Sequence, residues 1–142
     1  MSVETATDVI VDGVPFEVQK TILVADDETH ILHVVSLKLR NAGYHVLTAR
    51  DGQEALDLAL AERPDLLITD YHMPELSGLE LCQRLKQHPS TMGIPAIMLT
   101  ARGYDLEPAD TESSGICCML SKPFSPRQLL ATVNEVLRGI AA

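Results

Sequence analysis

The sequence predicts an α/β domain in which a parallel sheet is covered by helices on both faces. From Lys20 onward, short apolar runs alternate with segments of helical period, which is the pattern of strands joined by crossover helices. The first, third and fourth runs are nearly continuous in Ile, Leu, Val and Met, as expected of strands that are buried on both sides. We therefore expect these three strands at the centre of the sheet.

Five runs have the length and composition of strands. They cover residues 21–25, 45–49, 66–69, 96–99 and 116–120. The loops that follow parallel strands converge at one edge of the sheet, so polar residues directly after these runs are candidates for a functional site.

Helix signals lie between the runs. Apolar residues recur at helical spacing at Ile31, Val35 and Leu39, and Gly43 follows as a stop signal. Three further helix starts carry Asp or Ser with Glu or Gln three residues later: Asp51 with Glu54, Ser77 with Glu80, and Ser125 with Gln128. Segment 101–114 contains Gly103 and Pro108, and we expect a loop over residues 101 to about 106, followed by a helix of no more than about two turns.

Residues 1–19 stand outside this pattern, and we assign them to an N-terminal extension of a domain that covers residues 20–142. Asp12 and Gly13 lie between two apolar runs, which is a hairpin signal, although Pro15 weakens it. A disordered tail is an equally good interpretation of this segment.

Charge and composition exclude several classes of function. Twenty acidic against eleven basic residues give a formal charge of −9, so we expect no direct binding to nucleic acid. No apolar stretch is long enough to span a membrane, and the N-terminus does not resemble a secretory signal. The three cysteines form no disulfide framework, and we expect them to be small buried hydrophobes. We therefore expect a cytoplasmic protein.

Charged residues follow the predicted strands in a pattern that suggests a metal site. Asp26 and Asp27 follow the first strand, Asp70 the third, Thr100 the fourth and Lys122 the fifth. Three carboxylates at one edge would repel one another unless a cation lay between them. A small ion that keeps several waters suits a site with few protein ligands, and Mg²⁺ is the natural candidate.

Four ordered motifs carry a family resemblance. They are ILVADDE at residues 22–28, PDLLITDYHMP at 64–74 with Gly78, PAIMLTA at 95–101, and SKPF at 121–124. Together they resemble the response-regulator receiver family of two-component signalling, in its single-domain, chemotaxis-regulator-like form. The resemblance covers residues 20 to about 138. It implies a flavodoxin-like, doubly wound sheet of five parallel strands in the order 2-1-3-4-5.

The resemblance also implies roles for the residues at the acidic edge. Asp70 matches the family's phosphoacceptor, whose carboxylate attacks phosphorus and also binds the metal. Asp27 matches the direct Mg²⁺ ligand, and Asp26 matches the partner that acts through bound water. The backbone carbonyl of His72 matches the third protein ligand.

Four more positions match the family, and a fifth departs from it. Lys122 matches the ammonium that pairs with the phosphoryl oxygens, and Thr100 the hydroxyl that moves to bond one of them. Ala101 leaves room for the phosphoryl group, and Pro123 matches a peptide bond that is commonly cis. Met119 stands where the family has a switching aromatic residue, and a thioether has neither a hydroxyl nor a rigid ring.

The resulting prediction is a signalling phosphoacceptor that catalyses only its own phosphorylation and dephosphorylation. The expected donor is the phosphohistidine of a sensor histidine kinase or of a histidine phosphotransfer protein. We expect no output domain after Ala142, and therefore switched contacts with a downstream target protein or relay to a second histidine. One alternative is a non-phosphorylated pseudo-receiver that only binds partners. Another is a phosphohydrolase with an aspartyl nucleophile, which would require a second acid two residues after the nucleophile, at the position of His72.

Overall fold

The computed structural model describes residues 8–11, 14–17, 19–101 and 114–141. Five parallel strands form its main sheet: β3 (Thr21–Ala25), β4 (His45–Ala49), β5 (Leu66–Asp70), β6 (Ala96–Thr100) and β7 (Ile116–Ser121). Their order is β4-β3-β5-β6-β7, which confirms the predicted order 2-1-3-4-5 with the three apolar strands at the centre. The last three strands each run one residue further than predicted, because Asp70, Thr100 and Ser121 still pair with their neighbours or stay extended.

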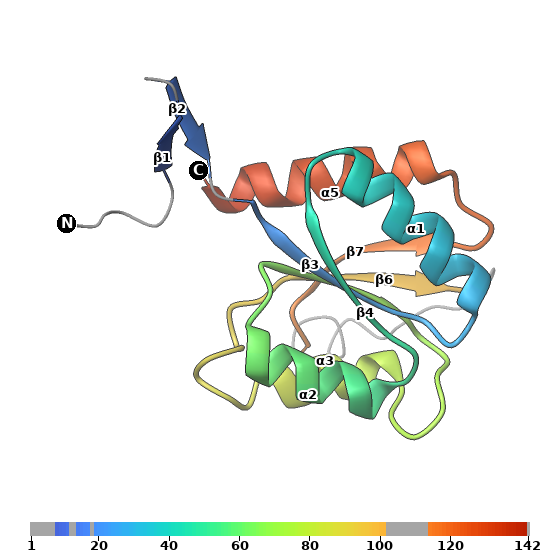
Figure 1. Ribbon diagram of the computed structural model, residues 1–142. Coiled ribbons are helices and arrows are strands. Elements are labelled where there is room, and N and C mark those ends of the chain that lie inside the picture. Colours follow the sequence, from blue (N-terminus) through green and yellow to red (C-terminus); the bar gives the residue numbers. More distant parts are fainter. Residues whose placement is uncertain (1–7, 12–13, 18, 102–113, 142) are drawn as a thin grey trace.

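Helices cover both faces of this sheet, as predicted. The described residues form α1 (Thr29–Asn41), α2 (Gly52–Glu62), α3 (Gly78–Leu85) and α5 (Pro126–Ala141). Helices α1 and α5 lie on one face, and α2 and α3 lie on the other (Figure 1). The short fourth helix expected within residues 101–114 falls on positions outside the described ranges.

Two apolar clusters, one on each face, hold the layers together. Ile22 and Ile68 point into the cluster under α1 and α5, whereas Leu23 and Leu67 point into the cluster under α2 and α3. All four side chains are almost completely buried. Successive residues of one strand thus contribute to opposite clusters, which is why the central strands are apolar at nearly every position.

Local capping explains where the helices begin. Ser77 and Glu80 form a complete capping box at the start of α3, as their spacing predicted. Asp51 caps α2 through the backbone N–H of Glu54, but the Glu54 carboxylate accepts from Arg50 at 2.8 Å instead of from Asp51. These caps satisfy N–H groups that have no partner within the helix.

Two glycines allow the loop after β5 to lie against the helix starts. A Cβ at Gly78 would be 2.2 Å from the backbone oxygen of Asp70. A Cβ at Gly52 would be 2.1 Å from the backbone oxygen of Leu76 in the same loop. Both approaches are too close for any other residue, so these glycines fix the path of the chain directly after Asp70.

The N-terminal segment contains a separate two-stranded sheet. Strands β1 (Asp8–Val11) and β2 (Val14–Glu17) pair in antiparallel register, with Asp8 opposite Glu17. This is the hairpin geometry of the first interpretation given for the segment. The division of the chain into an extension and a domain stays a prediction.

The cysteines are less uniformly buried than expected. Cys82 is buried and Cys118 is partly buried, but Cys117 is exposed. The reason is a register irregularity, because Ala96 pairs with Ile116 and Ile97 pairs with Cys118, which leaves Cys117 as an extra residue in β7. No helix in the described part of the chain is both long and apolar enough to cross a membrane.

Candidate functional site

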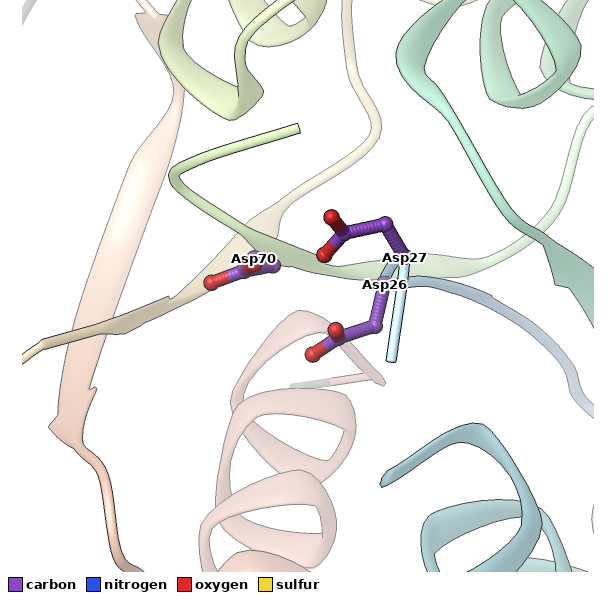
Figure 2. A group of neighbouring side chains, drawn as sticks. All are labelled: Asp26, Asp27 and Asp70. Carbon is purple, nitrogen blue, oxygen red and sulfur yellow. The ribbon is translucent and has the colours of Figure 1, made fainter. Parts of the chain in front are cut away.

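Three carboxylates meet where two neighbouring central strands end. Asp26 and Asp27 directly follow β3, and Asp70 is the last residue of β5. Figure 2 shows their side chains extending to the same side of the strand ends. One oxygen from each lies within 4.8 Å of the others, with Asp26 and Asp70 buried and Asp27 exposed. The parallel pairing of Ala25 with Thr69 brings the two strand ends level, and so brings the carboxylates together.

Lys122 supplies a positive charge to this cluster from the loop after β7. Its Nζ lies 2.9 Å from Asp26 Oδ2, 2.8 Å from Glu28 Oε1 and 3.3 Å from Asp70 Oδ1. The peptide bond between Lys122 and Pro123 is cis, the form that the resemblance led us to expect. One ammonium thus contacts carboxylates from both strand ends.

His72 borders the same space, and Thr100 lies at the end of β6 next to Ala101, which also borders it. Thr100 is buried at the end of β6, and its backbone oxygen accepts from the Lys122 N–H at 2.7 Å. A cavity of about 310 Å³ is lined by these residues: Asp27, Glu28, Asp70, His72, Ala101 and Lys122. The strand ends therefore bring together the predicted acidic, basic and loop residues.

Met119 is placed differently from these residues. It lies on β7 opposite Met98 and is 37 % exposed, so it does not fill an interior gap. Its proposed part in switching stays a prediction, because residues 102–113 lie outside the described part of the chain.

Burial and like charge perturb the two buried carboxyl groups. Burial, followed by the charge of Asp26, raises the pKa of Asp70 to about 6 despite the opposing effect of Lys122. Burial also raises the pKa of Asp26, although the N–H of Glu28 and the ammonium of Lys122 act against it. Burial lowers the pKa of Lys122, but its bonds with Glu28 and Asp26 outweigh this and leave that pKa above its usual value. The cluster carries more negative charge than a single lysine balances.

The donor set fits a hard divalent cation. The three aspartates offer only carboxylate oxygens, at separations that allow one ion to contact all of them. Two of these groups have raised pKa values, mainly because they are buried, and the charge of Asp26 raises the pKa of Asp70 further. An ion placed here would relieve that repulsion.

Glu28 is a member of this cluster that the sequence analysis missed. Its carboxylate accepts the shortest of the three Lys122 contacts, although the side chain is 60 % exposed. Glu28 is also the N-cap residue of α1, yet its side chain makes no capping hydrogen bond. A signal was present in the sequence, since Glu directly after an Asp pair at a strand end adds a fourth carboxylate to the edge.

A second, apolar cavity of about 630 Å³ adjoins the acidic one. Ile31, Val34, Pro123 and Phe124 contribute to its walls, which are formed by the start of α1 and the loop that leads into α5. Glu28, Ala101 and Lys122 line both cavities and therefore form the boundary between them.

Known proteins place this arrangement in a family. The family model described as the response regulator receiver domain matches residues 22–134. Among curated relatives, the phosphate regulon transcriptional regulatory protein PhoB of Pseudomonas aeruginosa is 41 % identical over 85 % of this chain and 53 % of its own length. The alkaline phosphatase synthesis transcriptional regulatory protein PhoP of Bacillus subtilis is 40 % identical over 84 % of this chain and 49 % of its own. The chain thus spans about half the length of these relatives.

Solved structures agree over nearly their whole length. A putative response regulator from Chloroflexus aurantiacus superimposes with a TM-score of 0.77 at 38 % identity, covering 84 % of this chain and 98 % of that one. The chemotaxis response regulator CheY4 of Vibrio cholerae gives a TM-score of 0.77 at 34 % identity, covering 84 % and 99 %. The fold, the edge cluster and these matches agree: the chain belongs to the response regulator receiver domain family of two-component signalling.

Proposed function

We propose that Asp70 accepts a phosphoryl group from a phosphohistidine donor and that this reaction switches contacts with other proteins. The observation that supports this most strongly is the contact geometry of Asp70, which lies in a cavity with a lysine 3.3 Å away and two further carboxylates close by. Such a site combines a nucleophile with the positive charge that phosphoryl transfer needs.

The proposed reaction exchanges one bond to phosphorus for another. An oxygen of the Asp70 carboxylate attacks the phosphorus atom, and an acyl phosphate forms as the bond between phosphorus and the donor's imidazole nitrogen breaks. The imidazole leaves with that electron pair and takes up a proton from solvent. The attacking group must be ionised, and Lys122 favours that form because it lowers the pKa of Asp70 against the effect of burial.

Lys122 and Thr100 stabilise the transferred group in this proposal. The Lys122 ammonium already lies beside Asp70 and would pair with phosphoryl oxygens. Thr100 ends the neighbouring strand β6, and its hydroxyl would move to bond another of those oxygens. Such a movement is the step that would carry the change to the rest of the protein, with Met119 on the adjacent strand as a further element of the switch.

We propose Mg²⁺ as the cofactor. Asp27 and Asp70 would bind it directly, Asp26 through water, and the backbone carbonyl of His72 would be the remaining protein ligand. When bound, the ion offsets the negative charge of the aspartates and of the incoming phosphoryl group. The observed oxygen donors support a hard cation of this kind.

Two alternatives fit the site less well. A pseudo-receiver without phosphorylation would have no use for the buried carboxylates of Asp26 and Asp70 or for the partly exposed Lys122 ammonium between them. Burying charged groups costs stability, so their presence favours a function that uses them. A phosphohydrolase would need an acid near the nucleophile, and His72 lines the cavity where that acid is expected. The signalling phosphoacceptor uses every one of these groups.

The partners follow from the same chemistry. A sensor histidine kinase or a histidine phosphotransfer protein would bring its phosphohistidine to the acidic cavity, and the apolar cavity beside it offers surface for docking. A downstream protein would then bind the phosphorylated form. The formal charge of −9 argues against contact between this domain and nucleic acid, and we propose that residues 1–19 are an extension outside the receiver.

One experiment tests the function. The protein is incubated with a small acyl phosphate, with Mg²⁺ or with a chelator, and the phosphorylated fraction is followed by intact-protein mass spectrometry. We expect one phosphoryl group on the parent protein, only with Mg²⁺, and none on Asp70→Asn. Failure of the parent protein to be phosphorylated would contradict the proposal, and rapid multiple turnover of the acyl phosphate would favour the hydrolase.

A further inference from the structure

We propose that Glu28 is a positioning residue that competes with the phosphoryl group for Lys122, and so limits how tightly the site holds that group. The inference rests on the function proposed above and concerns the regulation of the same site. It assigns to Glu28 a part that follows from its contacts rather than from the motif residues around it.

The first observation is the contact pattern of the ammonium. Lys122 Nζ has three N–H donors, and within the described part of the chain it donates to Asp26 at 2.9 Å and to Glu28 at 2.8 Å. Asp70 Oδ1 is the most distant of the three partners, at 3.3 Å. In the unphosphorylated protein the ammonium is therefore held more closely by Glu28 than by the proposed phosphoacceptor.

The second observation is that, among the described residues, the Glu28 side chain makes no hydrogen bond or ion pair other than the one with Lys122, and the charge of His30 acts on it only as the weakest influence on its pKa. Glu28 is the N-cap residue of α1, but its side chain accepts no N–H from the first helical turn. The backbone N–H of Glu28, and not its side chain, donates to Asp26 Oδ1 at 2.9 Å. A change in the side chain therefore alters the Lys122 contact and leaves the neighbouring bonds in place.

The third observation is the place of Glu28 between two cavities. It lines the acidic cavity together with Asp70, and it lines the apolar cavity together with Phe124. A phosphoryl group on Asp70 would bring negative charge into a space that Glu28 already borders. Both anions would then draw on one ammonium, and Lys122 would have to loosen its contact with Glu28 to approach the phosphoryl oxygens.

Energetics set a modest scale for this competition. The Glu28 side chain is 60 % exposed, so water screens its attraction to Lys122. Exposed ion pairs of this kind correspond to roughly two- to fivefold changes in an equilibrium constant. We expect loss of the Glu28 contact to tighten binding of a phosphoryl analogue by about that factor.

Two variants separate the contact from the charge. Glu28→Gln keeps the length of the side chain and removes its charge. Glu28→Asp keeps the charge but is shorter by one methylene group, so it loses reach toward Lys122. The control is Glu75→Gln, because Glu75 is exposed on the loop after Asp70 and makes none of the Lys122 ion pairs found among the described residues.

The experiment measures the affinity of the full chain for beryllofluoride, a phosphoryl analogue, at saturating Mg²⁺, and the affinity for Mg²⁺ alone. We expect both Glu28 variants to bind beryllofluoride about two- to fivefold more tightly than the parent protein, with Glu75→Gln unchanged. Affinity for Mg²⁺ alone should stay the same in Glu28→Asp and weaken slightly in Glu28→Gln. A general loosening of the structure would not tighten binding of beryllofluoride while leaving the Mg²⁺ affinity unchanged or slightly weaker.

Other outcomes overturn the proposal. If only Glu28→Gln tightens binding, charge repulsion alone is responsible and the Lys122 contact has no part. If neither variant differs from Glu75→Gln, Glu28 does not compete for Lys122. If the parent protein is phosphorylated at Asp70 but the Glu28 variants behave like the control, the proposed function holds and the role of Glu28 is rejected. A parent protein that binds no beryllofluoride overturns both.

Discussion

The interior and the edge of the three central strands differ in what they contribute. Within the sheet, β3, β5 and β6 present fully buried aliphatic side chains such as Ile22, Ile68 and Ile97, which pack against helices. Where the same strands end, the buried residues are Asp26, Asp70 and Thr100. The interior stabilises the fold, whereas the edge reduces that stability by holding charge out of water. The contrast teaches that the functional groups are kept in place by the strands to which they are attached.

The largest effect should come from the interior. Ile68→Ala removes a fully buried side chain from the centre of the sheet, and we expect unfolding free energy to fall by about 3 kcal/mol. Urea denaturation checks this, with Leu37→Ala as the control, because Leu37 is 51 % exposed and its truncation should change stability by no more than about 0.5 kcal/mol. Equal losses in the two variants would show that the sheet interior is not the source of stability.

At the edge of the sheet, we expect a substitution to increase the free energy of unfolding instead of decreasing it. Burial raises the pKa of Asp70 to about 6, from an ordinary value of 3.8, so the folded protein holds a proton here more readily than the unfolded chain does. The free energy of unfolding therefore decreases as the pH rises from about 4 through about 6, because ionising Asp70 costs more in the folded protein than in the unfolded chain. In a chelating buffer at pH 7.5, Asp70→Asn should be more stable than the parent protein by about 2 kcal/mol.

The pH dependence provides the control for this prediction. Below about pH 3 the carboxyl group is protonated in both folded and unfolded states, so the difference between Asp70→Asn and the parent protein should vanish. Urea denaturation at a series of pH values between these limits measures it. A parent protein as stable as the variant at pH 7.5 would mean that Lys122 fully balances the buried charge.

A smaller effect should follow from adding Mg²⁺. An ion that binds only the folded protein raises its stability, by about 1.4 kcal/mol at ten times the dissociation constant. Thermal unfolding of the parent protein should show this gain, and Asp27→Asn should lose most of it. Asp57→Asn is the matched control, since Asp57 is an exposed residue of α2 and the substitution removes the same charge. Equal responses in the two variants would argue against a site at the strand ends.

The interior of the sheet could be predicted from sequence more fully than its edges. Short, nearly continuous runs of aliphatic residues indicate buried parallel strands. The five strands and the central position of three of them were therefore predicted correctly. Helix starts were predictable where a polar residue caps the first turn, as at Ser77. These features depend on residues that are close in sequence or share one environment.

Other features depend on contacts between residues distant in sequence. The irregular register between β6 and β7, which leaves Cys117 exposed, has no signal in the composition of either strand. The pairing of Glu28 with Lys122 joins residues 94 positions apart, and only the folded strand ends show that it forms. Motif spacing predicted which residues gather at the edge, but it could not predict which carboxylate the ammonium contacts most closely.

The most direct test of the central claim is to locate the phosphoryl group. The protein is treated with Mg²⁺ and a small acyl phosphate, the product is trapped by reduction of the acyl phosphate, and the modified peptide is sequenced by mass spectrometry. Our account predicts that the modification lies at Asp70 in the parent protein and in Glu75→Gln. Modification at Asp26, Asp27 or another residue, with Asp70 unchanged, would contradict it.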